Sequence, residues 1–184
     1  TASNGITDSG ALTVTGSTRL VAGSGDIVLN NANDFGGAVS IVSAKDVSLN
    51  DANALDLGAS NLSGDLTVTT AGALSDSGAL HIGGAASFAV VSANNLTLDN
   101  AGNDFVGTLS IANAKDVTLR DATTLSLGAL DISGNLNLNT LGMVGNVAGT
   151  AWLVDGVLTL DAGGGDVVLD ALANDFGGAV NIAH

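Results

Sequence analysis

The sequence predicts an all-β fold, a right-handed parallel β-helix (β-solenoid) of about eight coils. Three observations lead to this prediction. The chain repeats itself at a long fixed interval, short segments alternate apolar with small polar residues, and the composition suits a thin core. Aromatic residues are only 3% of the chain, proline and tyrosine are absent, and 26 glycines are spread along it. A thick globular centre normally uses several large aromatic side chains, whereas small and branched aliphatic residues fill a narrow coil.

A seven-residue motif, Asn-Asp-Phe-Gly-Gly-Ala-Val, marks the repeat. It occupies residues 33–39, and related residues follow at 103–109 and 174–180, so the interval is roughly 70 residues. Residues 33–73 and 103–143 agree at about half their positions, which supports true duplication. We therefore treat 1–184 as one continuous array, made of a partial repeat (1–32), two full repeats (33–102 and 103–173) and a second partial repeat (174–184).

Within each repeat, two apolar residues flank one small polar residue at successive points along the chain. Such alternation, bounded by Gly, Asn, Asp and Ser, indicates short strands joined by tight turns. The expected inward pairs are Val39/Ile41, Val47/Leu49, Leu55/Leu57, Leu66/Val68, Leu80/Ile82, Phe88/Val90, Leu96/Leu98, Leu109/Ile111, Val117/Leu119, Leu125/Leu127, Leu136/Leu138, Leu158/Leu160 and Val167/Leu169. The expected outward residues between them include Ser40, Ser48, Asp56, Thr67, Thr97, Ser110, Thr118 and Asn137.

The order of these strands favours a solenoid over other all-β folds. Glycine is too frequent for stable helices, and Asn-Gly or Asp-Gly hairpin signals are scarce, which disfavours a meandering sandwich. In a parallel β-helix each coil carries about three short strands that pair with their counterparts one coil along. On the simplest register Val39, Leu66, Phe88 and Leu109 stack along one wall, and each repeat spans about three coils.

The recurrent motif is the structural site that the sequence predicts. Gly36, Gly37, Gly58 and Gly64 stand where turns need positive φ or close backbone approach. The Asn residues are expected to end strands and to bond turn backbone groups through their amides, and the Phe residues to fill one corner of the core. The predicted corner residues are Asn33, Asp34, Phe35, Asn103, Asp104, Phe105, Asn174, Asp175 and Phe176.

Charge and cysteine content exclude several functions. The formal net charge is −14, with four basic and eighteen acidic residues. Nucleic-acid binding needs a basic footprint, so we expect no nucleic-acid partner, and no apolar run is long enough for membrane insertion. With no cysteine, disulfides, thiolate metal sites and thiol catalysis are ruled out.

No catalytic, cofactor-binding or metal site is predicted. Residues 163–170, which begin Gly163-Gly164-Gly165-Asp166, partly resemble the glycine–aspartate nonapeptide that binds calcium in β-rolls, but the segment occurs once, so we interpret it as a structural turn. Lys45 and Lys115 recur at equivalent positions, whereas a catalytic site is normally unique; a polysaccharide-degrading β-helix enzyme stays a remote alternative. His81 is expected at the surface, and His184 is terminal. Trp152 replaces a small or aliphatic repeat residue and is interpreted as core packing, with an exposed contact as the alternative.

The units Asn33–Ser40 and Gly72–Leu80 resemble repeats of filamentous-haemagglutinin-like exoproteins, the large secreted partners of bacterial two-partner secretion systems. The resemblance covers essentially the whole chain. It implies a right-handed β-helical shaft behind a secretion domain, a location outside the cell or at the bacterial surface, and a role in adhesion or biofilm formation. An outer-membrane transporter as partner is implied by the resemblance alone.

These observations favour a non-enzymatic structural shaft, or spacer, of a secreted bacterial adhesin. The alternative is a module that itself binds glycans or proteins of a host surface or matrix; the small outward residues and scarce aromatics disfavour it. Because both ends cut through the repeat, unpaired strand edges are expected to allow end-to-end self-association.

Overall fold

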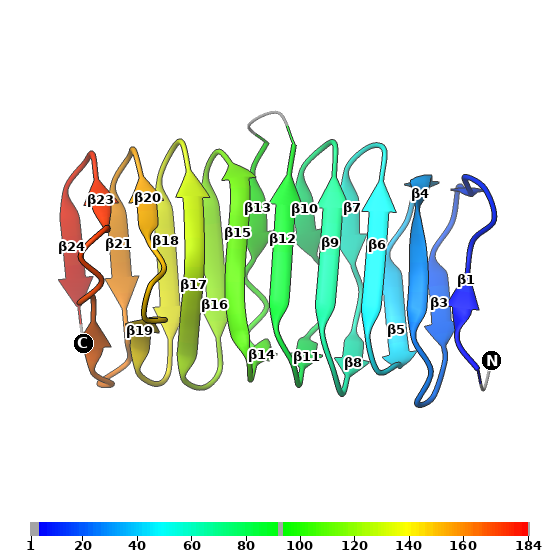
Figure 1. The fold of residues 1–184 in the computed structure, drawn as a ribbon, viewed down its shortest axis with the longest axis horizontal. Coiled ribbons are helices and arrows are strands. Elements are labelled where there is room, and N and C mark those ends of the chain that lie inside the picture. The colour runs from blue at the N-terminus through cyan, green and yellow to red at the C-terminus, as the bar shows by residue number, and fades with distance from the viewer. Residues whose placement is uncertain (1–3, 92–93, 184) are drawn as a thin grey trace.

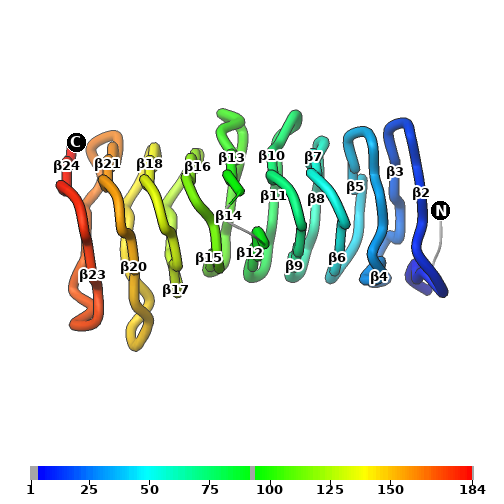
Figure 2. The backbone as a smooth tube through the Cα atoms, turned by 90° about the horizontal axis from the view of Figure 1, so that it is seen from above, coloured from blue at the N-terminus to red at the C-terminus, as the bar shows by residue number. Residues whose placement is uncertain are grey.

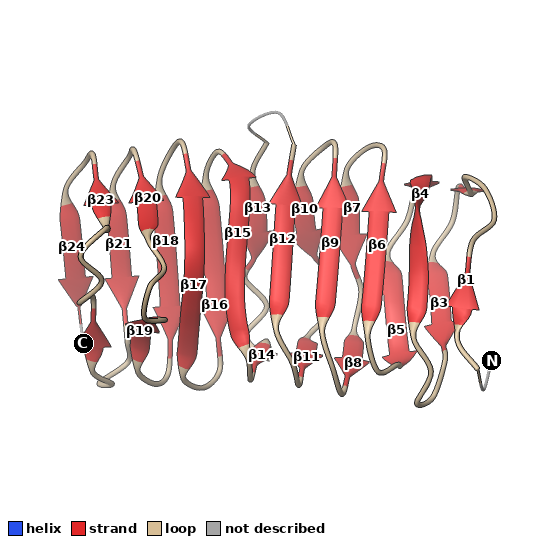
Figure 3. Cartoon of the chain, in the orientation of Figure 1, coloured by secondary structure: helices blue, strands red, loops and turns tan. Residues whose placement is uncertain are grey.

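The computed structural model describes residues 4–91 and 94–183 and is a parallel β-solenoid of about eight turns, which confirms the predicted fold class. Figure 1 shows a flattened rod with the two chain ends at opposite ends. The near strands run upward and the far strands downward while the chain advances from right to left, so the winding is right-handed (Figures 1 and 2). The described residues contain strands and connecting turns and no helix (Figure 3).

Two large sheets form the broad faces of the rod, and a third, small sheet lies along one edge. The 12-stranded sheet contains β1 (Ile6–Thr7), β2 (Thr13–Val14), β4 (Ile27–Phe35), β6 (Val47–Asp51), β9 (Leu66–Thr70), β12 (Ala86–Val90), β15 (Thr108–Ala114), β17 (Leu125–Ile132), β19 (Val144–Asn146), β20 (Trp152–Val154), β22 (Val167–Val168) and β23 (Asp175–Phe176). The nine-stranded sheet contains β3 (Thr18–Val21), β5 (Val39–Ser43), β7 (Leu55–Leu57), β10 (Leu74–Asp76), β13 (Leu96–Leu98), β16 (Val117–Asp121), β18 (Leu136–Thr140), β21 (Leu158–Asp161) and β24 (Val180–Ala183). The three-stranded sheet contains β8 (Ser60–Leu62), β11 (Leu80–Ile82) and β14 (Asp104–Phe105).

The core is a continuous column of aliphatic side chains between the two broad sheets. All the predicted inward pairs are buried except Val167/Leu169, which is half-buried. The aromatic rings of Phe88 and Phe105 meet edge to face in the middle of the rod, with centroids 6.3 Å apart. Every strand pairing is parallel, and paired residues are 18 to 23 positions apart in sequence, so one turn corresponds to about 20 residues.

Equivalent positions of successive repeats lie on opposite faces of the rod. Ile27 and Val167 are equivalent residues two repeats apart, and seven pairing steps along the 12-stranded sheet connect their strands. Two repeats therefore span seven turns, and one repeat spans three and a half. Leu96, the equivalent residue one repeat after Ile27, accordingly belongs to the nine-stranded sheet. Figure 2 shows the strands of the two sheets along opposite sides of the rod.

Because each repeat ends half a turn out of phase with the previous one, one detail of the predicted register is wrong. Leu66, Phe88 and Leu109 lie in the 12-stranded sheet as expected, but Val39 lies in β5 of the nine-stranded sheet. The predicted single wall through Val39 is wrong because 70 residues are not a whole number of 20-residue turns.

The turn glycines are required by close approach between turns. None of Gly36, Gly37, Gly58 and Gly64 has positive φ, but a Cβ at each would contact the preceding turn.

We expect Gly107→Ala to lower the free energy of unfolding by about 1–3 kcal/mol, because its methyl group would overlap the Gly84 backbone carbonyl. Gly16→Ala is the matched control, since no atom lies within 4 Å of the added methyl group. If urea unfolding showed the same loss of free energy for Gly107→Ala and Gly16→Ala, close approach between turns would not be the reason for the glycine.

Candidate functional site

The three corner Asn side chains tie neighbouring turns together. The Oδ1 atom of Asn33 accepts a hydrogen bond from the Leu12 N–H (2.8 Å), and that of Asn103 accepts one from the Leu80 N–H (2.9 Å). Asn174 accepts one from the Trp152 N–H in the same way (2.9 Å). The predicted side-chain bonds to backbone are therefore present, but they reach the preceding turn of the solenoid. The prediction that these Asn residues end strands is wrong: Asn33 lies within β4, and Asn103 and Asn174 directly precede β14 and β23, because the amide bonds hold the chain where it enters the corner strand.

Each corner amide also donates to a second side chain on the preceding turn. Asn33 Nδ2 donates to Asp8 Oδ2 (3.0 Å), and Asn103 Nδ2 donates to Asp76 Oδ2 (2.7 Å). In the third copy Asn174 Nδ2 donates to Asn146 Oδ1 (3.0 Å). Asn33 and Asn103 are fully buried. A buried amide is stable only when its polar atoms are bonded, so these side-chain pairs explain why a polar residue occupies the corner.

A buried carboxylate on the following turn completes the corner. Asp51 Oδ2 accepts the Phe35 N–H and Asp121 Oδ2 accepts the Phe105 N–H, both at 2.8 Å. Sequence reasoning missed these partners as well as Asp8 and Asp76. The available signal was their recurrence: Asp51 and Asp121 occupy the same repeat position, and Asp8 and Asp76 each precede Ser-Gly-Ala-Leu.

The other motif residues divide between interior and surface. Phe35 and Phe105 are buried in the core, while Phe176 in the last turn is half-buried. Asp34 and Asp104 are partly exposed and Asp175 is exposed. The motifs alternate between the two narrow edges of the rod: β14 lies at the lower edge in Figure 1, and β23 and the end of β4 lie at the upper edge.

Two corner carboxyl groups have raised pKa values. Burial raises the pKa of Asp76 and of Asp121 above the ordinary value of 3.8. Hydrogen bonds only partly offset it, from the Asn103 amide and backbone N–H groups in the case of Asp76 and mainly from backbone N–H groups in the case of Asp121. An acid with a raised folded-state pKa stabilises the fold below its unfolded pKa and loses this contribution as pH rises through the folded value. Asp46 has the opposite shift because Lys45 bonds it, but this pair is exposed and weak.

Because the ordinary Asp pKa is 3.8 and both folded-state values lie above it, we expect the protein to be more stable at about pH 4 than at pH 7. General repulsion from the net charge of −14 acts in the same direction but is screened by salt, whereas the cost of burying a carboxylate is not. The measurement is thermal unfolding at both pH values in about 0.5 M NaCl, where the Debye length is only a few ångströms. A flat pH profile at high salt would show that buried carboxyl groups do not contribute.

His81 and Trp152 occupy the environments that the sequence analysis favoured. His81 is half-exposed on β11, and its Nδ1 lies 2.9 Å from Asp104 Oδ2 of the next turn. Trp152 is fully buried, which confirms the packing interpretation, and its indole Nε1 has no hydrogen-bond partner. His184 lies outside the described residues.

The described residues contain no group of three or more His, Cys, Asp or Glu side chains that could hold a metal ion. The Gly163–Asp166 turn is exposed, and Gly163 N–H bonds Asp161 Oδ1 at 3.0 Å. Asp26, Asp46 and Asp65 stack on successive turns, but the Oδ1 of each accepts the backbone N–H of the next turn.

Independence from metal stays a prediction: excess EDTA is expected to leave the Tm unchanged, and a lower Tm that calcium restores would contradict it.

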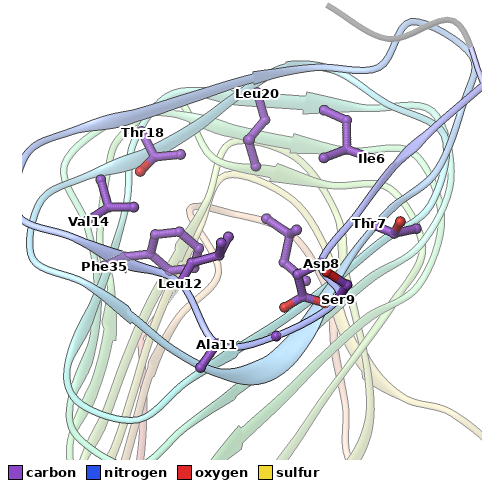
Figure 4. Close-up of a pocket in the computed structure, with 12 residues that line it drawn as sticks. Ile6, Thr7, Asp8, Ser9, Ala11, Leu12, Val14, Thr18, Leu20 and Phe35 are labelled. Carbon is purple, nitrogen blue, oxygen red and sulfur yellow. The ribbon is translucent and has the colours of Figure 1, made fainter.

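The N-terminal end of the core is open. Ile6, Leu12, Val14, Leu20 and Phe35 surround a hollow of about 450 Å³ (Figure 4). Its lining is mainly aliphatic, and of the carboxyl groups only Asp8 borders it. The hollow is the uncovered interior of a turn and carries no group of side chains suited to catalysis.

The family comparison agrees with this repeat geometry. A family described as repeats of unknown function (DUF5649) matches residues 1–42, 44–112 and 114–183. The chain belongs to this family. The matched copies begin about ten residues later than the repeats defined above from the Asn-Asp-Phe motif, but the period is the same. Searches of curated proteins and of solved structures found no similar protein. Among the described residues, no helix is long and apolar enough to cross a membrane.

Proposed function

We propose that the chain is a non-enzymatic shaft segment of a secreted bacterial surface adhesin. The observation that carries the proposal is the uninterrupted pairing of turns, from β1 to β22 in one broad sheet and from β3 to β24 in the other. Each turn adds apolar contacts and backbone hydrogen bonds to its neighbours only, so length and stability increase together. Such a structure holds another part of a protein at a distance from its anchor.

The cellular setting of this proposal comes from the resemblance to filamentous-haemagglutinin-like repeats. Export by two-partner secretion through an outer-membrane transporter, a place at the bacterial surface and a role in adhesion or biofilm formation all belong to the proposal. The corner network supports it indirectly, because side-chain bonds between turns resist sliding and splaying under load.

The test is replacement of this segment in its parent protein on the bacterial surface. For a shaft, an unrelated acidic β-solenoid with the same number of turns is expected to preserve cell attachment, whereas deletion is expected to reduce it. Loss of attachment after both changes would overturn the shaft proposal and favour direct binding. Saturable binding of the purified chain to polysaccharides or matrix proteins, absent from the unrelated solenoid, would count in the same direction.

We also propose that the isolated 184-residue chain associates end to end. One end presents the aliphatic hollow of Figure 4, and the other presents Val180 and Ile182 of β24, which are 42% and 45% exposed. Unpaired edge strands and apolar surface at both ends favour stacking. Sedimentation velocity is expected to show concentration-dependent oligomers, and a concentration-independent monomer with high thermal stability would contradict this.

A further inference from the structure

One part of the rod departs from the repeat. The connection between β19 and β20 has five residues (147–151), whereas the equivalent connection between β10 and β11 has three (77–79). Thr150 closes the longer connection with bonds from its N–H (3.2 Å) and Oγ1 (2.7 Å) to the Val147 carbonyl. Figure 2 shows this orange loop projecting beyond the other turns beside β20. With the neighbouring turn at 170–173 it forms what we call the C-terminal lobe.

The C-terminal lobe encloses an exposed hollow of about 340 Å³. Small residues of both turns line it, together with Asp170 and Leu172. The Leu172 side chain is fully exposed, and Leu153, which follows the longer connection on β20, is 44% exposed. The repeat elsewhere places His81 at the position of Leu153. An exposed leucine beside a small-residue hollow resembles the apolar centre of a protein interface.

The surroundings of these two leucines are acidic. Leu153 pairs with Asp131 on the preceding turn and Asp175 on the following turn, and both carboxylates are exposed. Residues 121–183 contain seven aspartates and neither lysine nor arginine. The potential over the C-terminal lobe is therefore negative, which attracts a basic partner and repels a second copy of the same surface.

We propose that the C-terminal lobe is a docking site for a basic segment of another protein. An apolar side chain of the partner occupies the hollow beside Leu172, and flanking Lys or Arg residues face Asp131, Asp170 and Asp175. The hollow has the size of a small ligand pocket, which suits one or two anchoring side chains. This inference is independent of the shaft proposal, because a spacer and a direct binder could both carry such a site.

The test uses synthetic peptides of alternating Leu and Lys, alternating Ser and Lys, and alternating Leu and Glu, with binding measured by fluorescence anisotropy. The Leu–Lys peptide is expected to bind saturably and at least about tenfold more tightly than the other two, since a tenfold difference equals about 1.4 kcal/mol. Equal binding of the Ser–Lys peptide would reduce the effect to unspecific attraction by charge and overturn the proposal.

Variants locate the binding. Leu153→Ser combined with Leu172→Ser is expected to weaken Leu–Lys binding about tenfold. Val42→Ser combined with Val106→Ser is the matched control, because these residues are 40% and 58% exposed at other sites. Equal affinity of both double variants would overturn the proposal. Reduced self-association of the Leu153/Leu172 variant in sedimentation would instead identify the occupant as a second copy.

Discussion

Replacing Asn103 by Asp is expected to lower the free energy of unfolding by about 3–5 kcal/mol at pH 7, the usual cost of an uncompensated buried charge. Asn103 is fully buried, and its amide donates to Asp76 Oδ2 at 2.7 Å. A carboxylate at this position has no proton to donate and faces the Asp76 carboxylate directly. Urea unfolding followed by far-ultraviolet circular dichroism measures the loss. The loss should shrink towards pH 4, where one of the two acids takes up a proton.

Two further variants separate the charge effect from a packing effect. Asp76→Asn in the Asn103→Asp background restores a donor and an acceptor, and we expect it to recover more than half of the lost stability. Asn53→Asp makes the same chemical change at an exposed site and is expected to change stability by less than about 0.5 kcal/mol. Failure of the Asp76→Asn rescue would mean that the corner depends on shape and not on the donor–acceptor pair.

Trp152→Ala is expected to cost about 3–5 kcal/mol, because it empties the largest fully buried side chain of the solenoid. Trp152→Leu should cost only about 1–2 kcal/mol. Leucine occupies the equivalent positions 12 and 80, and the change also removes the buried indole N–H that has no partner. Thermal and urea unfolding measure both variants.

The exposed neighbour Leu153 provides the control for position. Leu153→Ala is expected to change stability by less than about 0.5 kcal/mol, since its side chain faces solvent on the same strand. Equal costs for Trp152→Ala and Trp152→Leu would mean that the turns around position 152 have adapted to tryptophan and no longer accept the repeat residue.

The alternation of equivalent positions between faces has a consequence for longer arrays. Because each repeat spans three and a half turns, a given repeat position returns to the same broad face only in every second copy. Any binding site carried by every copy would therefore appear on both broad faces. The C-terminal lobe differs because neither Leu172 nor the adjacent strand residue Leu153 has a leucine counterpart in the preceding copies, so within residues 1–184 it occurs once.

Local sequence by itself determined the strands, their inward residues and the repeat. The pairs Val47/Leu49 and Leu136/Leu138 are buried as the alternation predicts, because period-two burial is a property of each short segment. The fold class also followed, since parallel winding satisfies short strands of this kind without helices. Burial of Trp152 was the favoured of two interpretations of the sequence, and the structure confirms it.

Only the tertiary structure decided which residues meet between turns. A turn here has 18 to 23 residues, and the register is the accumulated sum of these varying lengths. A difference of half a turn moved Val39 to the opposite sheet and placed equivalent corners on alternate edges. For the same reason the sequence did not predict that Asn33 bonds Asp8, 25 residues earlier, or that Asn103 bonds Asp76, 27 residues earlier. Local patterns specify which way a side chain points, whereas the lengths of the intervening turns specify what it touches.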